Sequence, residues 1–353
     1  MAENRDVIRE RMLSNLEDKY DKLPGTWTWE VYQSAALEEE TLGILLEDGL
    51  NQAFAGTADI EHLKVMAYED RGILYKDATF STGIVSVTGT PNAKVNLGDL
   101  FANDLLQYAA TETKILDSTG MANVNIQCVT AGSVGNTPIG SIRRFPKSLQ
   151  GINTVTNKAA LDNGYDEEGR DSLLKRYYLE IREPATSGNV NHYKQWTLSV
   201  EGVGDVKVKP LWNGNGTVKV VIIDSNRGVA SQELITKTYN YIETQRPIGA
   251  SVTVVSATEL VINISAKVTI RADYTQQQVK ESITKNIQQY FVETSFIENT
   301  IYYAKVGAII LNTEGVQNLD YSQFKLNNAT QDITLVDTNQ ETQIAKLGTL
   351  TLS

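Results

Sequence analysis

The 353-residue sequence is poor in the side chains that most often carry catalysis or bind metals. It contains one cysteine, Cys128, and two histidines, His62 and His192, far apart in the chain. A single cysteine excludes an intrachain disulfide and suits a reducing compartment. Neither histidine has a cysteine, histidine or carboxylate at metal-ligand spacing. We therefore expect no metal site and no cofactor, and we expect Cys128 to be a buried thiol in a strand.

Positive charge and long apolar runs are also scarce. Lys and Arg together number 32 against 43 Asp and Glu, so the net charge is −11. Binding to a phosphate backbone needs concentrated positive charge, which argues against a nucleic-acid partner. No apolar run approaches the roughly 20 residues that span a bilayer. Residues 1–22 are charged throughout and lack the apolar core of a signal peptide, so we expect no membrane partner.

The glycine-rich stretches do not match nucleotide-binding motifs. Lys207 follows Gly202-Val-Gly204 where a dinucleotide fingerprint needs a small residue, and no G-x-x-x-x-G-K-[ST] occurs. No G-x-S-x-G elbow supports a serine nucleophile. The carboxylates of residues 166–168 are better explained as helix caps than as a metal or acid–base site. These absences predict that the protein is not an enzyme.

What the sequence has instead begins with helical periodicity over residues 1–77. Apolar spacing predicts helices over residues 3–20, about 28–54 and about 58–68. The second helix is long and amphipathic, so its apolar stripe must lie against something. Packing within the chain and a bundle with other subunits both remain open. The candidate partner interface on this helix comprises Trp29, Tyr32, Leu42, Leu45, Leu46, Leu50 and Phe54.

From residue 78 the apolar period changes to two, which predicts a β-rich domain over residues 78–165. Residues 132–140 between its later strands form a loop rich in turn-forming residues. Strands are expected around residues 80–87, 107–113, 123–130 and 139–144.

Residues 166–257 are predicted as a first small α+β unit. An acidic stretch begins one helix, which Pro184 stops, and Ser187-Gly188-Asn189 begins a second that runs to about Ser199. Alternating strands around Asn213-Gly-Asn-Gly216 predict a hairpin. Ser231 is placed to cap a further helix before a strand at Val252–Val254.

Residues 258–353 are predicted as a second small α+β unit, which completes a multidomain α+β fold. Strict alternation from Leu260 to Ile270 indicates a strand, and Thr275 and Gln278 have the spacing of a capping box. The triplet Glu-Gly-Val follows a short helix at residues 201–203 and again at 314–316, which suggests an internal duplication. Residues 332–352 are expected to form short strands or an extended arm.

These segments, taken in order, resemble the baseplate J-like proteins of contractile phage tails and related tail-like particles. One departure is Asp162-Asn-Gly-Tyr165, where the family more often has paired glycines. The residues that carry the resemblance are the long helix Trp29–Phe54 with Thr57-Ala58 and Asp70–Ile73, then Gly83–Gly89 and Ala131–Asn136, the acidic helix from Tyr165 with Pro184, Ser187–Asn189 with Tyr193–Trp196, Glu201–Val203 and Asn213–Val218.

The resemblance implies a structural role as a baseplate wedge component, located in a virion or tail-like particle that is assembled in the bacterial host cytoplasm. Wedge proteins of this kind pair with a second copy and with a smaller helical wedge protein, similar to tail protein I. They also contact sheath-initiator and hub proteins. Two alternatives remain from the residues alone: a peripheral tail adhesin for host surface glycans, and a cell-wall hydrolase. The hydrolase would need paired carboxylates about 5–9.5 Å apart in a cleft.

Overall fold

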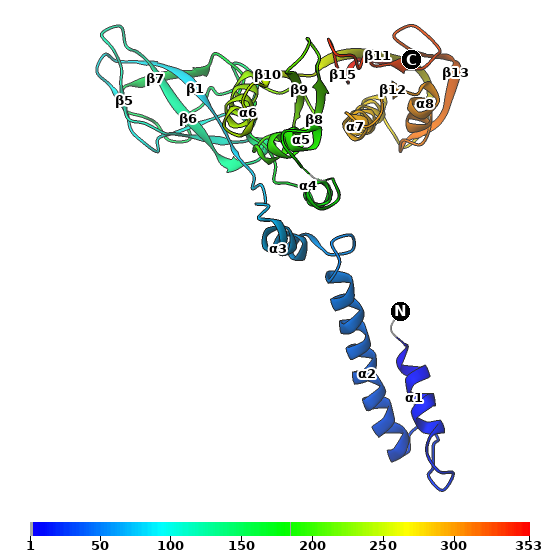
Figure 1. The fold of residues 1–353 in the computed structure, drawn as a ribbon. Helices are drawn as coiled ribbons and strands as arrows, with labels where there is room; N and C mark the ends of the chain where they lie inside the picture. The colour runs from blue at the N-terminus through cyan, green and yellow to red at the C-terminus, as the bar shows by residue number, and fades with distance from the viewer. Residues whose placement is uncertain (1–2, 184) are drawn as a thin grey trace. The chain divides into compact units, whose positions relative to one another are not determined.

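The structure is a computed structural model that describes residues 3–183 and 185–353. Contacts divide it into two units, which we call the helical unit (residues up to Tyr75 with Gly169–Tyr178) and the larger unit (Lys76–Glu168 with Leu179–Ser353). Helices come first, and strands and helices alternate later, which confirms the predicted α+β fold class (Figure 1). Pro184, the expected helix stop, lies outside the described residues.

The helical unit begins with two antiparallel helices, α1 (Arg5–Ser14) and α2 (Trp27–Gln52), which lie side by side (Figure 1). The side chain of Thr26 caps α2 by accepting a hydrogen bond from the amide of Trp29. The predicted first helix over residues 3–20 was too long, because the chain turns after α1 at its C-cap, Asn15.

The remaining helices of the helical unit fix the conformation of the turn that follows α2. Helix α3 (Ile60–Arg71) packs against the first part of α4 (Arg170–Arg182), and Leu63 and Leu173 are fully buried between them. The Arg170 guanidinium donates to the backbone carbonyls of residues 55, 56 and 58 at 2.7–3.2 Å. One side chain therefore fixes the three residues through which α2 leads into α3.

The β domain is a five-stranded sheet in the order β3-β4-β6-β1-β7, beside a small β2-β5 pair. The predicted strand over residues 139–144 was wrong: only Arg144 forms an isolated bridge, to Ala102. The amide of Ile142 instead donates to the side chain of Asn157, which removes it from any ladder. The elements are β1 (Phe80–Gly89), β2 (Lys94–Val95), β3 (Leu100–Ala102), β4 (Gln107–Ala110), β5 (Lys114–Ile115), β6 (Met121–Ala131), η1 (Ser133–Gly135) and β7 (Ile152–Asn157).

The acidic residues before α4 do not all cap that helix, which begins only at Arg170. Asp166 accepts hydrogen bonds from the amide and hydroxyl of Ser133, both at 2.7 Å, in the loop after β6. The prediction that Asp166 caps a helix was therefore wrong. This carboxylate ties the end of the β domain to one of its own loops.

The central module runs from α5 to β10 and forms a sheet in the order β10-β9-β8. Strands β8 and β9 are antiparallel across the Asn213–Gly216 segment, which confirms the hairpin, and β10 is parallel to β9. Asn189 caps α5 and Ser231 caps α6, as predicted. The elements are α5 (Val190–Ser199), β8 (Val203–Pro210), β9 (Thr217–Asp224), α6 (Gln232–Gln245) and β10 (Ser251–Ser256).

The C-terminal module runs from β11 to β15, with a sheet in the order β13-β11-β15. The capping box of Thr275 and Gln278 is present at the start of α7, and the last residues form strands, as expected. The elements are β11 (Thr258–Ile270), α7 (Gln276–Thr294), β12 (Thr300–Ile301), α8 (Tyr303–Leu311), β13 (Val316–Leu326), β14 (Ile333–Thr334) and β15 (Gln343–Leu352).

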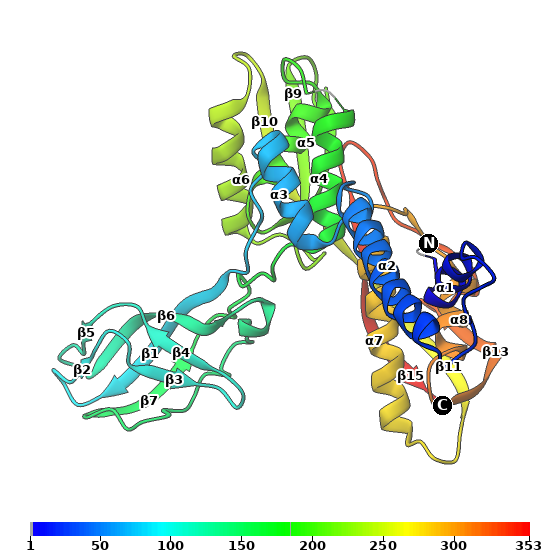
Figure 2. The same cartoon turned by 90° about the horizontal axis from the view of Figure 1, so that it is seen from below.

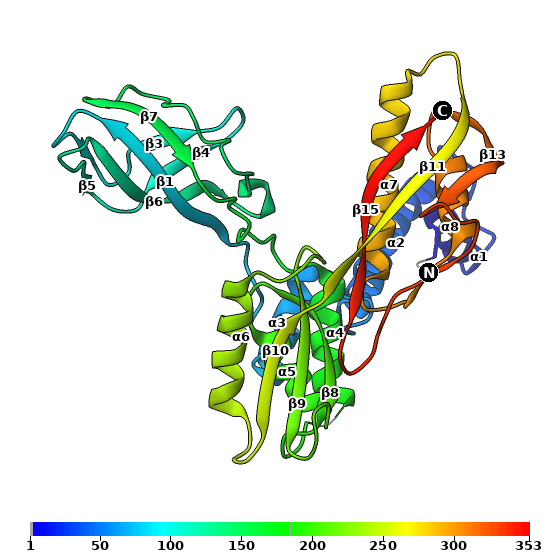
Figure 3. The same cartoon turned by 90° about the horizontal axis from the view of Figure 1, so that it is seen from above.

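The two modules share one layout but not one chain order (Figure 3). In each, a central strand has an antiparallel neighbour that follows a helix and the triplet Glu-Gly-Val, and a parallel neighbour on its other side. The antiparallel strand β8 precedes its central strand β9, whereas β13 follows its central strand β11. The repeat suggested by the sequence is thus present as a layout with permuted connections.

Candidate partner interface

Helix α1 runs beside the first half of α2 (Figures 1 and 2). The second half of α2 carries apolar side chains that are exposed in the described chain. Five of the seven predicted interface residues lie there: Leu42, Leu45, Leu46 and Leu50 on the helix, and Phe54 just beyond its C-cap. Their exposed fractions are 57–67%. Soluble proteins seldom leave apolar side chains contiguous and exposed to this degree, and such patches mark interaction sites.

The other two predicted residues, Trp29 and Tyr32, are half-buried in the first half of α2. The Trp29 ring lies against α1, with the guanidinium of Arg9 5.0 Å from the ring centroid. The amide of Arg5 donates to the carboxylate of Glu40 at 3.0 Å, so contacts with α1 reach as far as that residue. The first half of the stripe therefore packs within the chain.

Four exposed apolar residues on α2 were not among the predicted interface residues: Trp27, Val31, Leu37 and Ile44, which are 80%, 42%, 45% and 55% exposed. Ile44 lies two residues from Leu42 and Leu46, and a helix turns about 200° over two residues, so Ile44 faces away from both. The signal was the run Leu42-Gly-Ile-Leu-Leu46, which is too continuous for a one-sided stripe. Covering α2 here requires contacts on more than one side.

The charge of α2 is of one sign. Its 26 residues contain six acidic side chains and no lysine or arginine. Arg11 of α1 pairs with Glu39 at 3.1 Å, which offsets part of this charge. The segment from residue 3 to 52 has twelve acidic and five basic side chains, a net charge of −7 out of −11 for the whole chain. The exposed part of α2 is therefore both apolar and acidic.

The histidines and the cysteine have local packing roles in this structure. His62 Nδ1 lies 2.9 Å from Asp59 Oδ1 at the N-cap of α3, and the His192 ring stacks on Trp196 with centroids 4.1 Å apart. Cys128 is buried in the β-domain core. Within the described ranges, no three His, Cys, Asp or Glu side chains gather as a metal site would require. No helix in the described part of the chain is long and apolar enough to cross a membrane.

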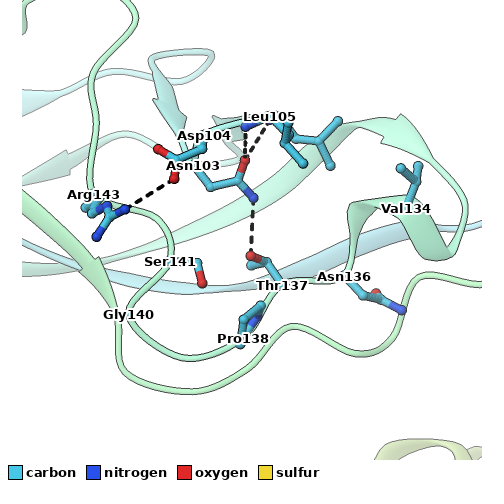
Figure 4. Close-up of a pocket in the computed structure, with 11 residues that line it drawn as sticks. Asn103, Asp104, Leu105, Val134, Asn136, Thr137, Pro138, Gly140, Ser141 and Arg143 are labelled. Atoms are coloured by element: carbon cyan, nitrogen blue, oxygen red, sulfur yellow. Dashed lines mark hydrogen bonds and ion pairs between the residues drawn. The ribbon is translucent and has the colours of Figure 1, made fainter. Parts of the chain in front are cut away.

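The β domain contains an open pocket of about 420 Å³ between the loops that follow β3 and β6 (Figure 4). Its polar groups bond to one another. The Asn103 amide donates to Thr137 Oγ1 and its oxygen accepts from the amide of Leu105, while Arg143 pairs with Asp104 at 3.2 Å. With its main polar groups engaged in this way, the pocket is a gap between loops, and we assign it no ligand.

Comparison with known proteins matches most of this chain to one family. Residues 84–164, 185–256 and 262–353 match the barrel, central and C-terminal domains of baseplate J-like proteins. The chain is 34% identical to the phage-like element PBSX protein XkdT of Bacillus subtilis, over 97% of this chain and 95% of that protein. It is 27% identical to baseplate protein gp47 of Escherichia phage Mu, over 50% of this chain and 49% of gp47. A chain in the cryo-EM structure of the anti-feeding prophage baseplate covers 97% of this chain and 97% of its own length, with 11% identity and a TM-score of 0.39.

Proposed function

Since this chain belongs to the baseplate J-like family, we propose that it is a wedge subunit, which pairs with a second copy of itself and with a smaller helical wedge protein, similar to tail protein I. At a coarser level, it is a structural protein of the baseplate of a phage tail or related contractile particle. In this role it would join hub and sheath-initiator proteins to the outer baseplate. Its rearrangement would be coupled to sheath contraction, and no catalytic step is involved.

The observation that carries the proposal is the uncovered apolar surface of α2. Leu42, Leu46 and Leu50 follow one another at four-residue spacing, which is the spacing of a helix–helix contact. Ile44 faces away from them, so a single neighbouring helix would leave apolar surface in water. A bundle with at least two further helices would cover both apolar sides of α2. This supports a bundle with a second copy of the chain and a smaller helical protein.

Charge supports a division of roles between these two partners. Two copies of α2 alone would bring twelve carboxylates together with no cation on either helix. Like charges at helix–helix spacing repel one another, and the repulsion grows where the contact excludes water. We propose that the smaller helical protein lies between the two copies and supplies lysine or arginine side chains beside its apolar stripe.

The test of this function is a paired substitution on α2. Leu46→Asp with Leu50→Asp should abolish co-purification of the smaller partner and of the second copy, because the carboxylates cannot be buried in an apolar contact. Both leucines are more than half exposed, so the isolated chain should keep its circular dichroism and its unfolding midpoint. The matched control is Ser34→Asp with Thr41→Asp, two exposed polar positions on the same helix, which should retain both partners. Retention of both partners by the leucine pair would refute the bundle.

The remaining contacts are assigned by module. We propose that the central and C-terminal modules supply the contacts to neighbouring wedges, to the hub and to the sheath initiator. The location is then the baseplate of the particle, assembled in the host cytoplasm. A peripheral adhesin for host glycans would instead lie away from the hub, so the position and copy number of the chain in purified particles separate the two functions.

A further inference from the structure

Three lysines gather on one face of the central module's sheet. Strand alternation sends Val206, Val208, Val220 and Ile222 toward α5 and α6 and sends Lys207, Lys209 and Lys219 to the opposite face. Lys209 and Lys219 lie directly opposite each other on β8 and β9. Lys219 is only 7% exposed, and the side chains of Lys207 and Lys209 are 19% and 17% exposed. Three ammonium groups held this close repel one another unless anions offset them.

The anion comes from the C-terminal module. Residues 336–343, which we call the strap, connect β14 to β15 and cross this face. Asp337 accepts from Lys207 at 2.7 Å and from Lys209 at 2.5 Å, one oxygen to each ammonium. Lys219 donates to the backbone carbonyls of Asn339 and Gln340, at 3.2 and 2.6 Å. One carboxylate and two backbone carbonyls thus accept hydrogen bonds from the three lysine ammonium groups.

The strap is a closed loop with apolar anchors at both ends. Within it, the amide of Gln343 donates to the carbonyl of Val336 at 2.8 Å. At one end, Leu335 is buried in the core of the C-terminal module. At the other end, Ile344 packs with Val221, Ile223 and Ala257 on the same sheet face as the lysines. Between these anchors, the strap is held by the three lysines, by Thr258, which donates to Glu341 Oε1 and to the carbonyl of Thr342, both at 2.9 Å, and by a longer bond from Asn299 to Asp337 at 3.5 Å.

The negative charge of Asp337 holds the strap in place on the three lysines. Partial burial alone would raise the pKa of Asp337, but hydrogen bonds and charge from Lys207 and Lys209 hold it at about 2. Removing one partner of a buried ion pair leaves uncompensated charge. Without the Asp337 charge, Lys207 and Lys209 would both lose the carboxylate that they bind, and the simplest relief is for the strap to lift so that water reaches them.

We propose that the strap is a releasable lock between the two modules. With Asp337 seated on Lys207 and Lys209, the central and C-terminal modules move as one body. With the strap lifted, the apolar cluster of Ile344 with Val221, Ile223 and Ala257 still joins the modules, and they can hinge about it at Ala257, the single residue between β10 and β11. This device is separate from the α2 interface and holds whether or not the chain is a wedge subunit.

Hydrogen exchange on the full chain tests the lock, with Asp337→Asn as the primary variant. Asparagine keeps the shape of the side chain but removes the charge. The amides of Thr338, Gln343 and Thr258, which donate within the strap or to it, should exchange at least tenfold faster than in the wild type. The amides of the α7 core around Ile283 should be unchanged. The control is Glu259→Gln, which removes an exposed ion pair with Lys346 inside the C-terminal module and should leave the strap amides as they are.

A double-mutant cycle separates the lock from a general loss of stability. Lys209→Gln should also accelerate strap exchange, and the double variant should be accelerated by much less than the product of the two single effects, because both act through one contact. Strap exchange within twofold of the wild type in Asp337→Asn would overturn the proposal. So would equal acceleration of the strap and α7, since that result means global destabilisation.

Discussion

Gly202 and Gly315 occupy equivalent places in the two modules, and each has a positive φ, +92° and +88°. Each is the glycine of a Glu-Gly-Val triplet that leads into the antiparallel strand. A Cβ at Gly202 would lie 2.8 Å from the Tyr165 ring, and one at Gly315 would lie 2.7 Å from the Tyr274 ring. The triplet could be found in the sequence, but the contact of a tyrosine ring with each glycine could not, because the tertiary fold brings the two residues together.

Alanine at either glycine should therefore cost more than backbone strain alone. Gly202→Ala and Gly315→Ala should each lower the free energy of unfolding by about 2–4 kcal/mol, from the left-handed conformation plus overlap with a ring. Gly214→Ala is the matched control, because φ is +100° there and no atom lies within 4 Å of the added Cβ. It should cost about 1–2 kcal/mol. Urea unfolding measures all three, and equal losses at the three sites would contradict the ring contact.

Asp224 shows what a sequence cannot reveal about a single carboxylate. Burial raises the pKa of Asp224 to about 6, although the amides of Gly228 and Asn226 hydrogen-bond it, and the charge of Asp162 adds to the rise. The folded state then binds a proton more tightly than the unfolded chain. The contribution of this group to stability is therefore complete below its ordinary pKa of 3.8, falls as pH rises above that value, and is lost as pH rises through about 6.

Asp224→Asn should remove this pH dependence. At pH 8 the variant should be more stable than the wild type by about 2–3 kcal/mol, because the neutral amide avoids the free-energy cost of burying a charged carboxylate. Its oxygen can still accept the hydrogen bond from the amide of Gly228. Below pH 3.8, where Asp224 is protonated in both the folded and the unfolded state, the difference should vanish. Urea unfolding of both proteins across this range gives the curve. A difference that stays constant with pH would contradict the raised pKa.

At the scale of elements, most helices and caps could be predicted from local pattern, because capping and amphipathic spacing act over a few residues. The capping box at Thr275 and Gln278 is an example. Non-local features could not be predicted. Residues 139–144 have strand composition, yet the Asn157 side chain takes the amide of Ile142. The parallel pairing of β15 with β11 joins residues 85–86 positions apart in the chain, and neither strand's own sequence indicates its partner.

The turn that follows α2 depends on one arginine. Arg170→Lys should lower the free energy of unfolding of the helical unit by about 2–3 kcal/mol, because an ammonium cannot donate to three carbonyls in the fork geometry of a guanidinium. Thermal unfolding followed at 222 nm measures the loss. Arg5→Lys, at an exposed residue of α1, is the control and should change stability by less than about 0.5 kcal/mol. A similarly small change for Arg170→Lys would show that the carbonyl contacts contribute little.

At the scale of the whole molecule, the order of motifs indicated the family, and family membership follows from the relatives. The exposure of the α2 side chains could be only partly predicted from the sequence. Leu42, Leu46 and Leu50 followed from helical spacing, whereas the position of α1 decides that Trp29 faces its own chain. The strap could not be foreseen, because it depends on which sheet face meets the C-terminal module.

A wedge subunit of the proposed kind requires that the second half of α2 be buried by other chains in the assembled baseplate. A cryo-EM reconstruction of the whole particle tests it most directly. We predict that Leu42, Leu46 and Leu50 contact a second copy of this chain or the smaller helical protein, that Ile44 contacts a further helix, and that basic side chains of the smaller protein lie beside the α2 carboxylates. An α2 that faces solvent in the assembled baseplate, with these leucines uncovered, would contradict the account.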